Sequence, residues 1–167
     1  ELYGARIESI VRKEGESLCI GFLSDCIDEA YAPDADRLAA KVIRLLADLL
    51  CDPYLQDGVF CPDYTAGERE GLIDRIAAQK NDPRSWAPER LTELMCENEP
   101  YGQPALGTIE QARKITENKL YTAYRRALDE AQIELFYCGT LPPDAVEALF
   151  ASTPLVQRRD GPLYQPQ

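Results

Sequence analysis

TAGEREGLIDRIAAQKN, at residues 65–81, has the pattern of a charged amphipathic helix. The apolar residues that share one face at helical spacing are Leu72, Ile73, Ile76 and Ala77. Thr65 and Glu68 are three residues apart, which predicts a capping box at the start of this helix. Its acidic and basic side chains fit a solvated surface helix, and they also fit a helix that carries a metal ligand. The rest of the chain has to distinguish these two interpretations.

Length and charge limit the class of protein. A chain of 167 residues with 45% hydrophobic content is long enough for one domain with a core. The net charge of -11, with Lys and Arg gathered only in pairs, argues against nucleic acid or an anionic membrane as a partner. No apolar run approaches about 18 residues, so no membrane-spanning helix is expected. The chain has no histidine, which removes the usual general base, the usual zinc ligand and every Ser-His or Cys-His pair.

The cysteines are scattered without a C-x-x-C pair, which argues against a zinc site built from thiolates. They are Cys19, Cys26, Cys51, Cys61, Cys96 and Cys138. We expect reduced, mostly buried thiols in a cytoplasmic protein, and a disulfide framework is the alternative. The chain starts without methionine, inside a predicted strand, so we expect it to be part of a longer polypeptide.

The start of the chain predicts a hairpin. Residues 2–12 alternate between the two sides of a half-buried strand. A turn is expected around Gly15, and residues 17–26 have the pattern of a second strand. Two strands so close in sequence predict antiparallel pairing.

The strongest helix pattern covers residues 34–52. Apolar residues recur there at helical spacing, and Asp34 is the predicted N-cap. The helix is expected to stop before Pro53, because the residue that precedes a proline disfavours the helical conformation. A loop that contains Gly58 then leads into the helix at residues 65–81.

A further helix is predicted over residues 84–97. Asp82 is its expected cap and Pro83 its first residue, although Pro88 favours a start a few residues later. The residues expected on its buried face are Ala87, Leu91, Leu94 and Met95. The aromatic residues expected to be packing or loop anchors rather than ligand contacts are Trp86 and Tyr101.

The last third of the chain predicts three short elements and one longer helix. Thr108 and Gln111 form a capping box for a short helix, and Thr116 caps a longer one. The residues expected to point inward from that longer helix are Leu120, Tyr124 and Leu128. Residues 131–139 alternate like a strand, and residues 142–151 form a last short helix.

These elements predict an α+β fold, with helices on one face of a mostly antiparallel sheet. Residues 1–150 are expected to form a single domain that is truncated at its N-terminal side. Residues 151–167, which are rich in proline and include a DG turn signal, are expected to be a linker or a disordered tail. No G-K-S/T tripeptide occurs, which excludes a P-loop.

The order of the elements, together with several runs of sequence, resembles the insulinase/pitrilysin-type family of zinc metallopeptidases, and most closely its YfmF-like non-catalytic bacterial members. The runs span residues 1–150 in the family's order: ELYGARIESIVRKEGESLCIGF, LLADLLCDP, GEREGLIDRIAAQKNDPRSWAPERL, ENEPYGQPALGTIEQARKIT and IELFYCGTLPPDAVEALF. The resemblance implies a partial insulinase-family (LuxS/metallohydrolase-like) domain. Active members carry an inverted zinc motif, H-x-x-E-H, before the segment that resembles the start of this chain. That motif is absent here, so zinc is expected only if a parent protein carries it upstream of Glu1.

The third zinc ligand of active members is a glutamate on the helix that resembles residues 65–81. Aligning its neighbours on Glu68 and Ile76 places this ligand position at Arg75. A guanidinium group keeps its charge and has no lone pair to offer, so it cannot coordinate zinc. Asp74 is a poor substitute, because one residue turns the side chain by about 100° around the helix. The resemblance therefore implies no catalytic or metal-ligating residue in this chain.

Active members also bind extended peptides by adding them to a sheet edge. The strand that resembles this edge includes Glu8, Ser9 and Ile10, which stand at the positions of the family's N-A-x-T-like run. An ordinary paired strand already accounts for the alternation of residues 5–11, and this interpretation is favoured over a peptide-binding edge.

The resemblance implies a non-catalytic peptidase-like domain that holds a peptide or protein substrate and pairs with a zinc-competent homologue. The alternative is a piece of an active zinc endopeptidase whose H-x-x-E-H motif lies upstream of Glu1. A third interpretation is an unrelated α+β binding domain. Because a sheet without its first strands exposes an edge and an apolar face, we also expect self-association into homo-oligomers.

Overall fold

The computed structural model describes residues 4–31 and 37–157. The chain divides into two compact units. Unit 1 consists of Glu1–Glu8, Phe22–Tyr54 and Thr122–Gln167, and unit 2 consists of Ser9–Gly21 and Leu55–Tyr121. The structure mixes helices with small two-stranded sheets, which confirms the predicted α+β class.

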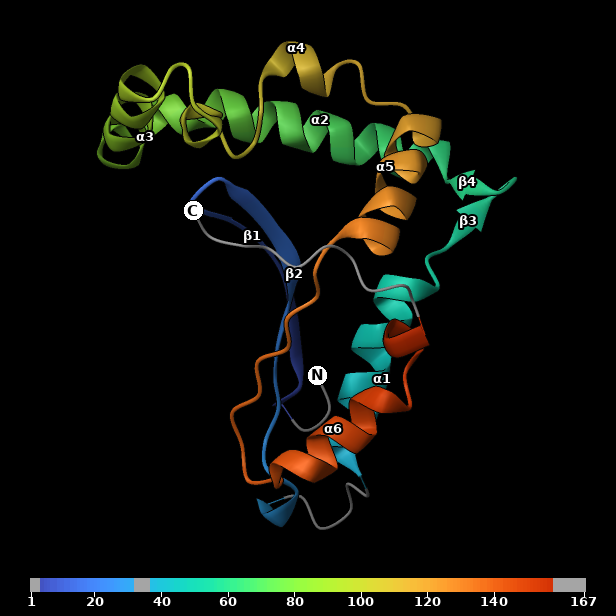
Figure 1. Cartoon of the computed structure of the whole chain (residues 1–167). Coiled ribbons are helices and arrows are strands. Elements are labelled where there is room, and N and C mark those ends of the chain that lie inside the picture. Colours follow the sequence, from blue (N-terminus) through green and yellow to red (C-terminus); the bar gives the residue numbers. More distant parts are fainter. Residues whose placement is uncertain (1–3, 32–36, 158–167) are drawn as a thin grey trace. The chain divides into compact units, whose positions relative to one another are not determined.

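The predicted N-terminal hairpin is present (Figure 1). Strand β1 (Arg6–Glu14) pairs with β2 (Ser17–Asp25) in a two-stranded sheet. The two strands are joined by Gly15 and Glu16 alone, and Gly15 has a φ of 58°. Glycine with positive φ at the first of two loop positions is the arrangement of a type II′ turn, whose twist matches that of the strands. The turn therefore fixes the pairing of β1 with β2.

A second hairpin replaces the loop that was predicted around Gly58. Strands β3 (Leu55–Gln56) and β4 (Val59–Phe60) pair antiparallel, with Leu55 opposite Phe60. Between them Asp57 has a φ of 52° and Gly58 a φ of 82°. Two left-handed residues in a row are typical of a type I′ turn, and Asp-Gly is a favoured pair for it. The Asp57-Gly58 dipeptide in the sequence therefore indicates this hairpin.

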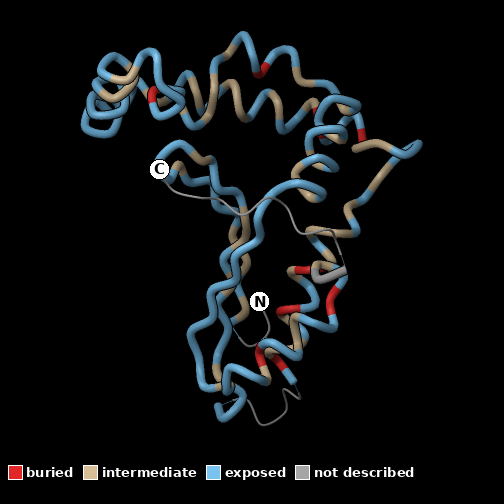
Figure 2. The backbone as a smooth tube through the Cα atoms, in the orientation of Figure 1, coloured by how far each residue is buried: buried red, intermediate tan, exposed pale blue. Residues whose placement is uncertain are grey.

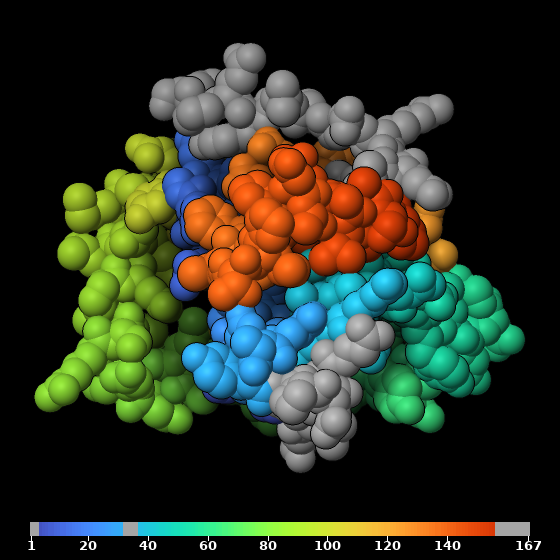
Figure 3. Space-filling view, turned by 90° about the horizontal axis from the view of Figure 1, so that it is seen from below, coloured from blue at the N-terminus to red at the C-terminus, as the bar shows by residue number. Residues whose placement is uncertain are grey.

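The buried side chains of unit 1 lie mainly between two helices, α1 (Leu38–Cys51) and α6 (Pro143–Ala151). The buried apolar residues on these helices are Leu38, Ile43, Ala47 and Val146. Figure 2 colours the buried parts of the backbone red. In the space-filling view the orange-red atoms of α6 lie beside the cyan atoms of α1 (Figure 3). A short 3-10 helix, η5 (Pro154–Gln157), packs on both. As predicted, α1 ends before Pro53; the predicted cap Asp34 lies outside the described residues.

Helix α5 (Glu117–Glu130) follows Thr116, as predicted. The hydroxyl of Thr116 accepts a hydrogen bond from the Lys119 N–H at 3.4 Å. Tyr124 points inward and donates from its hydroxyl to the Leu50 carbonyl at 2.6 Å. Leu50 lies in the last turn of α1, where helical carbonyls have no partner within the helix. Tyr124 therefore ties the C-terminal end of α1 to α5 within unit 1.

The longest helix of unit 2 is α2 (Pro62–Ala78), which the 3-10 helix η3 (Gln79–Asn81) extends. It begins a turn earlier than predicted, and the predicted capping box of Thr65 with Glu68 is wrong. Pro62 occupies the first helical position, where its fixed φ favours the helix and its missing N–H is not needed. The Thr65 N–H therefore already bonds to the Cys61 carbonyl at 2.9 Å, while the Glu68 side chain is exposed.

The side chain of Thr65 gives a testable consequence of this shifted start. Thr65 is buried, and its hydroxyl has no hydrogen-bond partner among the described residues. A buried hydroxyl without a partner is destabilising, so Thr65→Val should raise the free energy of unfolding by about 1 kcal/mol. Urea unfolding of the variant and the wild type measures the difference. Thr92→Val is the matched control, because the Thr92 hydroxyl donates to the Pro88 carbonyl at 3.0 Å. A Thr65→Val variant less stable than the wild type would mean that the Thr65 hydroxyl makes a stabilising hydrogen bond after all.

Two predicted helix caps of unit 2 are confirmed. Helix α4 (Ile109–Ala112) starts with the reciprocal capping box of Thr108 and Gln111. At the start of α3 (Pro83–Met95), the Asp82 carboxylate accepts from the Arg84 N–H at 3.1 Å and from the Ser85 hydroxyl at 2.7 Å. The hydrogen bond from Ser85, and then that from Arg84, lowers the pKa of the Asp82 carboxyl.

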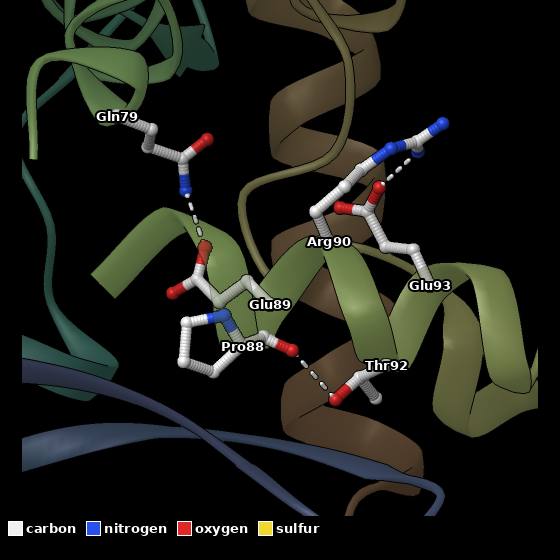
Figure 4. Close-up of polar contacts among 6 residues, drawn as sticks. All are labelled: Gln79, Pro88, Glu89, Arg90, Thr92 and Glu93. Carbon is white, nitrogen blue, oxygen red and sulfur yellow. Dashed lines mark hydrogen bonds and ion pairs between the residues drawn. The ribbon is translucent and has the colours of Figure 1, made fainter. Parts of the chain in front are cut away.

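The interior of α3 departs from the prediction in two respects. Pro88 does not delay the start of the helix; it lies inside it, and the Thr92 hydroxyl donates to its carbonyl (Figure 4). Further hydrogen bonds in Figure 4 join Gln79 to Glu89 at 3.2 Å and Arg90 to Glu93 at 2.6 Å. The predicted buried face is wrong, since its four residues are all exposed: Ala87, Leu91, Leu94 and Met95.

The predicted strand at residues 131–139 is also wrong for this chain. These residues have no strand pairing, and they are exposed throughout, with Phe136 fully so. A strand needs a hydrogen-bonded neighbouring strand, and in the described part of the chain no strand forms beside this segment. It is joined to the rest of unit 1 by the Thr140 hydroxyl, which donates to the Asp28 carboxylate at 2.5 Å.

Asp28 also caps the following turn, because it accepts from the Ala30 N–H at 2.8 Å. The hydrogen bond from Thr140, followed by that from Ala30, lowers the pKa of the Asp28 carboxyl. The folded-state pKa is therefore below the unfolded one. The resulting stability is present above the unfolded pKa and is lost as the pH falls through the folded pKa.

Candidate functional site

The predicted third-ligand position, Arg75, lies exposed on α2. Its Nε donates to the Gly71 carbonyl of the same helix at 3.4 Å, which is a long hydrogen bond. Asp74 and Glu68 are exposed on the same helix. Within residues 4–31 and 37–157, no group of three His, Cys, Asp or Glu side chains is placed to hold a metal ion. The donor set around Arg75 does not fit zinc, because it consists of a guanidinium group beside single carboxylates.

A second arginine on α2 has a structural role. The Nη1 of Arg69 donates to the Ile115 carbonyl at 3.2 Å, and its Nε lies 3.8 Å from the Glu70 carboxylate. The Arg69 side chain is 29% exposed, so it is more enclosed than a free surface arginine. Its hydrogen bond crosses from α2 to the segment between α4 and α5. The two arginines of this helix therefore differ: Arg69 joins elements of unit 2, and Arg75 does not.

Replacement of each arginine tests this difference. Arg69→Ala should lower the free energy of unfolding by about 1–2 kcal/mol, because it removes a charge-assisted hydrogen bond and the packing of the side-chain stem. Arg75→Ala, the matched control on the same helix, should change it by less than about 0.5 kcal/mol. Urea unfolding of both variants measures the two values. Equal values would show that the bond to Ile115 has no net stabilising effect.

The predicted peptide edge lies on β1. The carboxylate of Glu8 forms an ion pair with Arg6, whereas Ser9 and Ile10 are exposed. In the described part of the chain β1 pairs only with β2, so one of its edges presents backbone groups that are not hydrogen-bonded to another strand. Such an edge can accept an extended peptide as an additional strand. The structure thus gives the predicted strand an open edge, and binding itself stays a prediction.

The tip of the hairpin holds a contact that the sequence analysis missed. The Lys13 ammonium group donates to the carbonyls of Tyr101 and Gln103, and it lies 4.9 Å from the centre of the Tyr101 ring. Lys13 is 88 positions from Tyr101 and 90 from Gln103 in the sequence, so no local pattern indicates their contact. Tyr101 is a loop anchor, as predicted. Lys13 fastens the hairpin to the turn that contains η4 (Pro100–Gly102).

A hollow of about 240 Å³ lies beside this contact, within unit 2. It is bounded by the first residues of β2 and by the proline-rich turn after α3. The residues that line it are Lys13, Glu16, Ser17, Leu18, Pro100, Gln103, Pro104 and Ala105. Most of its wall is apolar, and the charged groups stand at the side formed by the hairpin.

None of the six cysteines forms a disulfide, but only Cys61 is buried, so the prediction of mostly buried cysteines is wrong. Cys51 and Cys96 are half-buried, and the other three are exposed. For Cys26, burial raises the pKa of the thiol, and the neighbouring carboxylates, Glu29 first, raise it further. A raised pKa keeps this thiol protonated, which disfavours a role as a nucleophile.

The comparisons with known proteins place this chain beside bacterial metalloproteases. No family model matches it. It is 32% identical over 148 residues to a protein of Bacillus subtilis (strain 168) named "Probable inactive metalloprotease YmfF", covering 89% of this chain and 35% of that protein. It is 24% identical over 107 residues to "Uncharacterized zinc protease ML0855" of Mycobacterium leprae, covering 64% of this chain and 24% of that protein. A similar match, 22% identical over 110 residues, is "Uncharacterized zinc protease SCO5738" of Streptomyces coelicolor, covering 66% of this chain and 24% of that protein.

The fold has a relative of known structure. A conserved protein from Enterococcus faecalis V583 matches 99% of this chain and 40% of its own length, with a TM-score of 0.85 and 23% identity. The chain therefore spans well under half of the length of each of these relatives. Among the described residues no helix is both long and apolar enough to cross a membrane.

Proposed function

Since this chain is a homologue of bacterial metalloproteases and fits an insulinase-like family, we propose that it is a non-catalytic, peptidase-like domain of that family. In this proposal the α+β segment is part of an insulinase-family (LuxS/metallohydrolase-like) domain with helices on one face of its sheet. It holds a peptide or protein substrate, and its parent protein pairs with a zinc-competent homologue. The similarity to a relative named as a probable inactive metalloprotease supports this function.

The observation that carries the proposal is the guanidinium group of Arg75 at the position where the family resemblance implies a glutamate ligand. Arg75 is exposed, and no described side chain near it completes a zinc site. The test is the metal content and peptidase activity of the full-length protein. We expect substoichiometric zinc and no peptidase activity that a chelator removes. Stoichiometric, tightly bound zinc with proteolysis lost on chelation would overturn the proposal.

A second candidate function is that of an active zinc endopeptidase whose H-x-x-E-H motif lies upstream of Glu1. The names of two relatives, both zinc proteases, favour it. It needs a third ligand other than Arg75, and the exposed Asp74 is the nearest carboxylate in sequence. The sequence that precedes Glu1 in a parent protein discriminates the two functions, because the non-catalytic proposal expects that motif to be incomplete.

Substrate holding is proposed at the free edge of β1, around Glu8, Ser9 and Ile10. In a hairpin with a two-residue loop, the residues that flank the loop, Glu14 and Ser17, form a hydrogen-bonded pair. Counting back along β1 in steps of two residues, the backbone N–H and C=O of Ile10 also point to β2. This count places Gly21 opposite Ile10, and a Cβ added at Gly21 would indeed lie 3.9 Å from the Ile10 side chain. The N–H and C=O of Ser9 then point to the free edge.

Ser9→Pro tests this edge. It removes the outward N–H of Ser9 while leaving the ladder between β1 and β2 in place, so an extended peptide should lose at least about tenfold in affinity. Ser9→Ala, which keeps the backbone donor, should bind like wild type. Isothermal titration with an extended test peptide measures both. Equal binding by the two variants would show that peptides do not add to this edge.

Two further properties belong to the proposal. The hairpin exposes several large apolar residues, which favours self-association: Val11, Leu18, Ile20 and Leu23. Six cysteines without a disulfide are compatible with a reducing compartment, and we propose a cytoplasmic location for the protein.

A further inference from the structure

We propose that the hollow at the tip of the β1 and β2 hairpin receives a lysine or arginine side chain of the bound peptide. The inference rests on the proposed peptide-holding function and names the class of peptide that this function would select. It is built on the lining of the hollow, on the state of the two charged groups beside it, and on the charge of the whole chain.

The size and walls of the hollow suit a single long side chain. Its volume is about 240 Å³, which is below the 300–1,000 Å³ typical of small-molecule sites. The apolar part of its wall comes from Leu18, Pro100, Pro104 and Ala105. Lysine and arginine bury an aliphatic stem against such a surface while the charged end stays in contact with water. Ser17 and Leu18 begin β2, so the hollow lies at the end of the sheet that the peptide is proposed to join.

The charged groups favour a cationic end over an anionic one. The Lys13 ammonium group donates to two carbonyls and lies over the Tyr101 ring, so its hydrogen-bonding capacity is largely used within the protein. The Glu16 carboxylate lines the same hollow, and no described residue bonds to it. Lys13 keeps its positive charge, but two of its three donors are engaged, so an anion gains few hydrogen bonds there. A cation can pair with the Glu16 carboxylate, to which no described residue bonds.

The charge of the whole chain acts in the same direction. A formal net charge of -11 attracts cationic ligands at long range, and such steering raises association rates. This general attraction does not require the hollow, so an experiment must separate the two. Glu110 provides the means, because it is an exposed acid on α4 that does not line the hollow.

The experiment titrates the full chain with four extended peptides that differ at one central residue: lysine, norleucine, glutamate or glycine. We expect the lysine peptide to bind about threefold tighter than the norleucine peptide, the range of an exposed ion pair, with the glutamate peptide weakest. Glu16→Lys should abolish or reverse this order. Glu110→Lys changes the net charge equally and should preserve it. Ala105→Leu, which fills the hollow, should weaken the lysine peptide and leave a peptide with central glycine unchanged.

Each result distinguishes the two proposals. If all peptides bind equally, or if Glu16→Lys and Glu110→Lys have the same effect, the peptide-holding function stands and the specificity of the hollow is overturned. If no peptide binds the wild-type chain, both are overturned. If the chain associates with itself in place of peptide, and Ala105→Leu abolishes that association, the occupant is a second copy and the inference is wrong.

Discussion

Replacing Gly102 with alanine should destabilise unit 2 by about 3 kcal/mol, at the upper end of the range for overpacking. Gly102 is buried in η4, where the chain folds back on the end of α3. A Cβ added to it would lie 2.0 Å from the Cys96 carbonyl oxygen and 2.6 Å from the carbonyl carbon. Backbone atoms cannot move aside as a flexible side chain can, so the turn must open. Urea unfolding followed by the fluorescence of Trp86, the only tryptophan, reports on unit 2.

Gly67→Ala is the matched control for this change. Gly67 is exposed in α2, and an added Cβ there meets no atom within 4 Å. Alanine in a helix interior loses less backbone freedom on folding than glycine, so this variant should be more stable by about 0.5–1 kcal/mol. The same substitution is therefore expected to have opposite signs at two positions of one unit. A Gly102→Ala variant as stable as wild type would mean that the turn after α3 relaxes without loss.

Local chemistry explains which elements could be predicted from the sequence. The cap at Asp82 and the capping box at Thr108 involve groups within three residues of one another, and both are present. The hairpin at Gly15 also follows from a short-range rule, since glycine permits the turn. The same kind of rule would have found the second hairpin at Asp57 and Gly58. Such short-range hydrogen bonds need no distant partner, but they depend on where the helix starts: the predicted box of Thr65 and Glu68 does not form because α2 already begins at Pro62.

Two of the failed predictions, the buried face of α3 and the strand at residues 131–139, concern partners that lie far away in sequence. The periodicity of α3 is real, but Met95 is 75% exposed, because periodicity indicates which side of a helix is apolar and not whether another element covers it. Residues 131–139 alternate as a strand does, yet a strand forms only beside a hydrogen-bonding neighbour. At the candidate site, the position of Arg75 followed from family resemblance alone. The contact of Lys13 with Tyr101 and Gln103 depends on tertiary folding and had no signal in the sequence.

Unit 1 should be the part of the chain most sensitive to loss of a single apolar side chain. Ile43→Ala is expected to lower its free energy of unfolding by about 2–4 kcal/mol, through lost burial and the cavity left behind. Ile43 is 7% exposed on α1, one turn before the fully buried Ala47. Few side chains of this unit are buried, so one of them is a large share of its apolar burial. Hydrogen exchange of the amides of α1 and α6 measures the loss directly.

Leu45→Ala separates burial from helix propensity. Like Ile43→Ala, it shortens a four-carbon side chain of α1 to a methyl group. Leu45 is 48% exposed, so the change should lower the free energy of unfolding by less than about 1 kcal/mol. Both variants introduce alanine, the residue with the highest helix propensity. The gain in helix propensity is therefore nearly the same in the two variants. A difference of about 2 kcal/mol between them would therefore come from packing of α1 against α6 and η5. Similar losses would mean that the apolar face of α1 is not the core of unit 1.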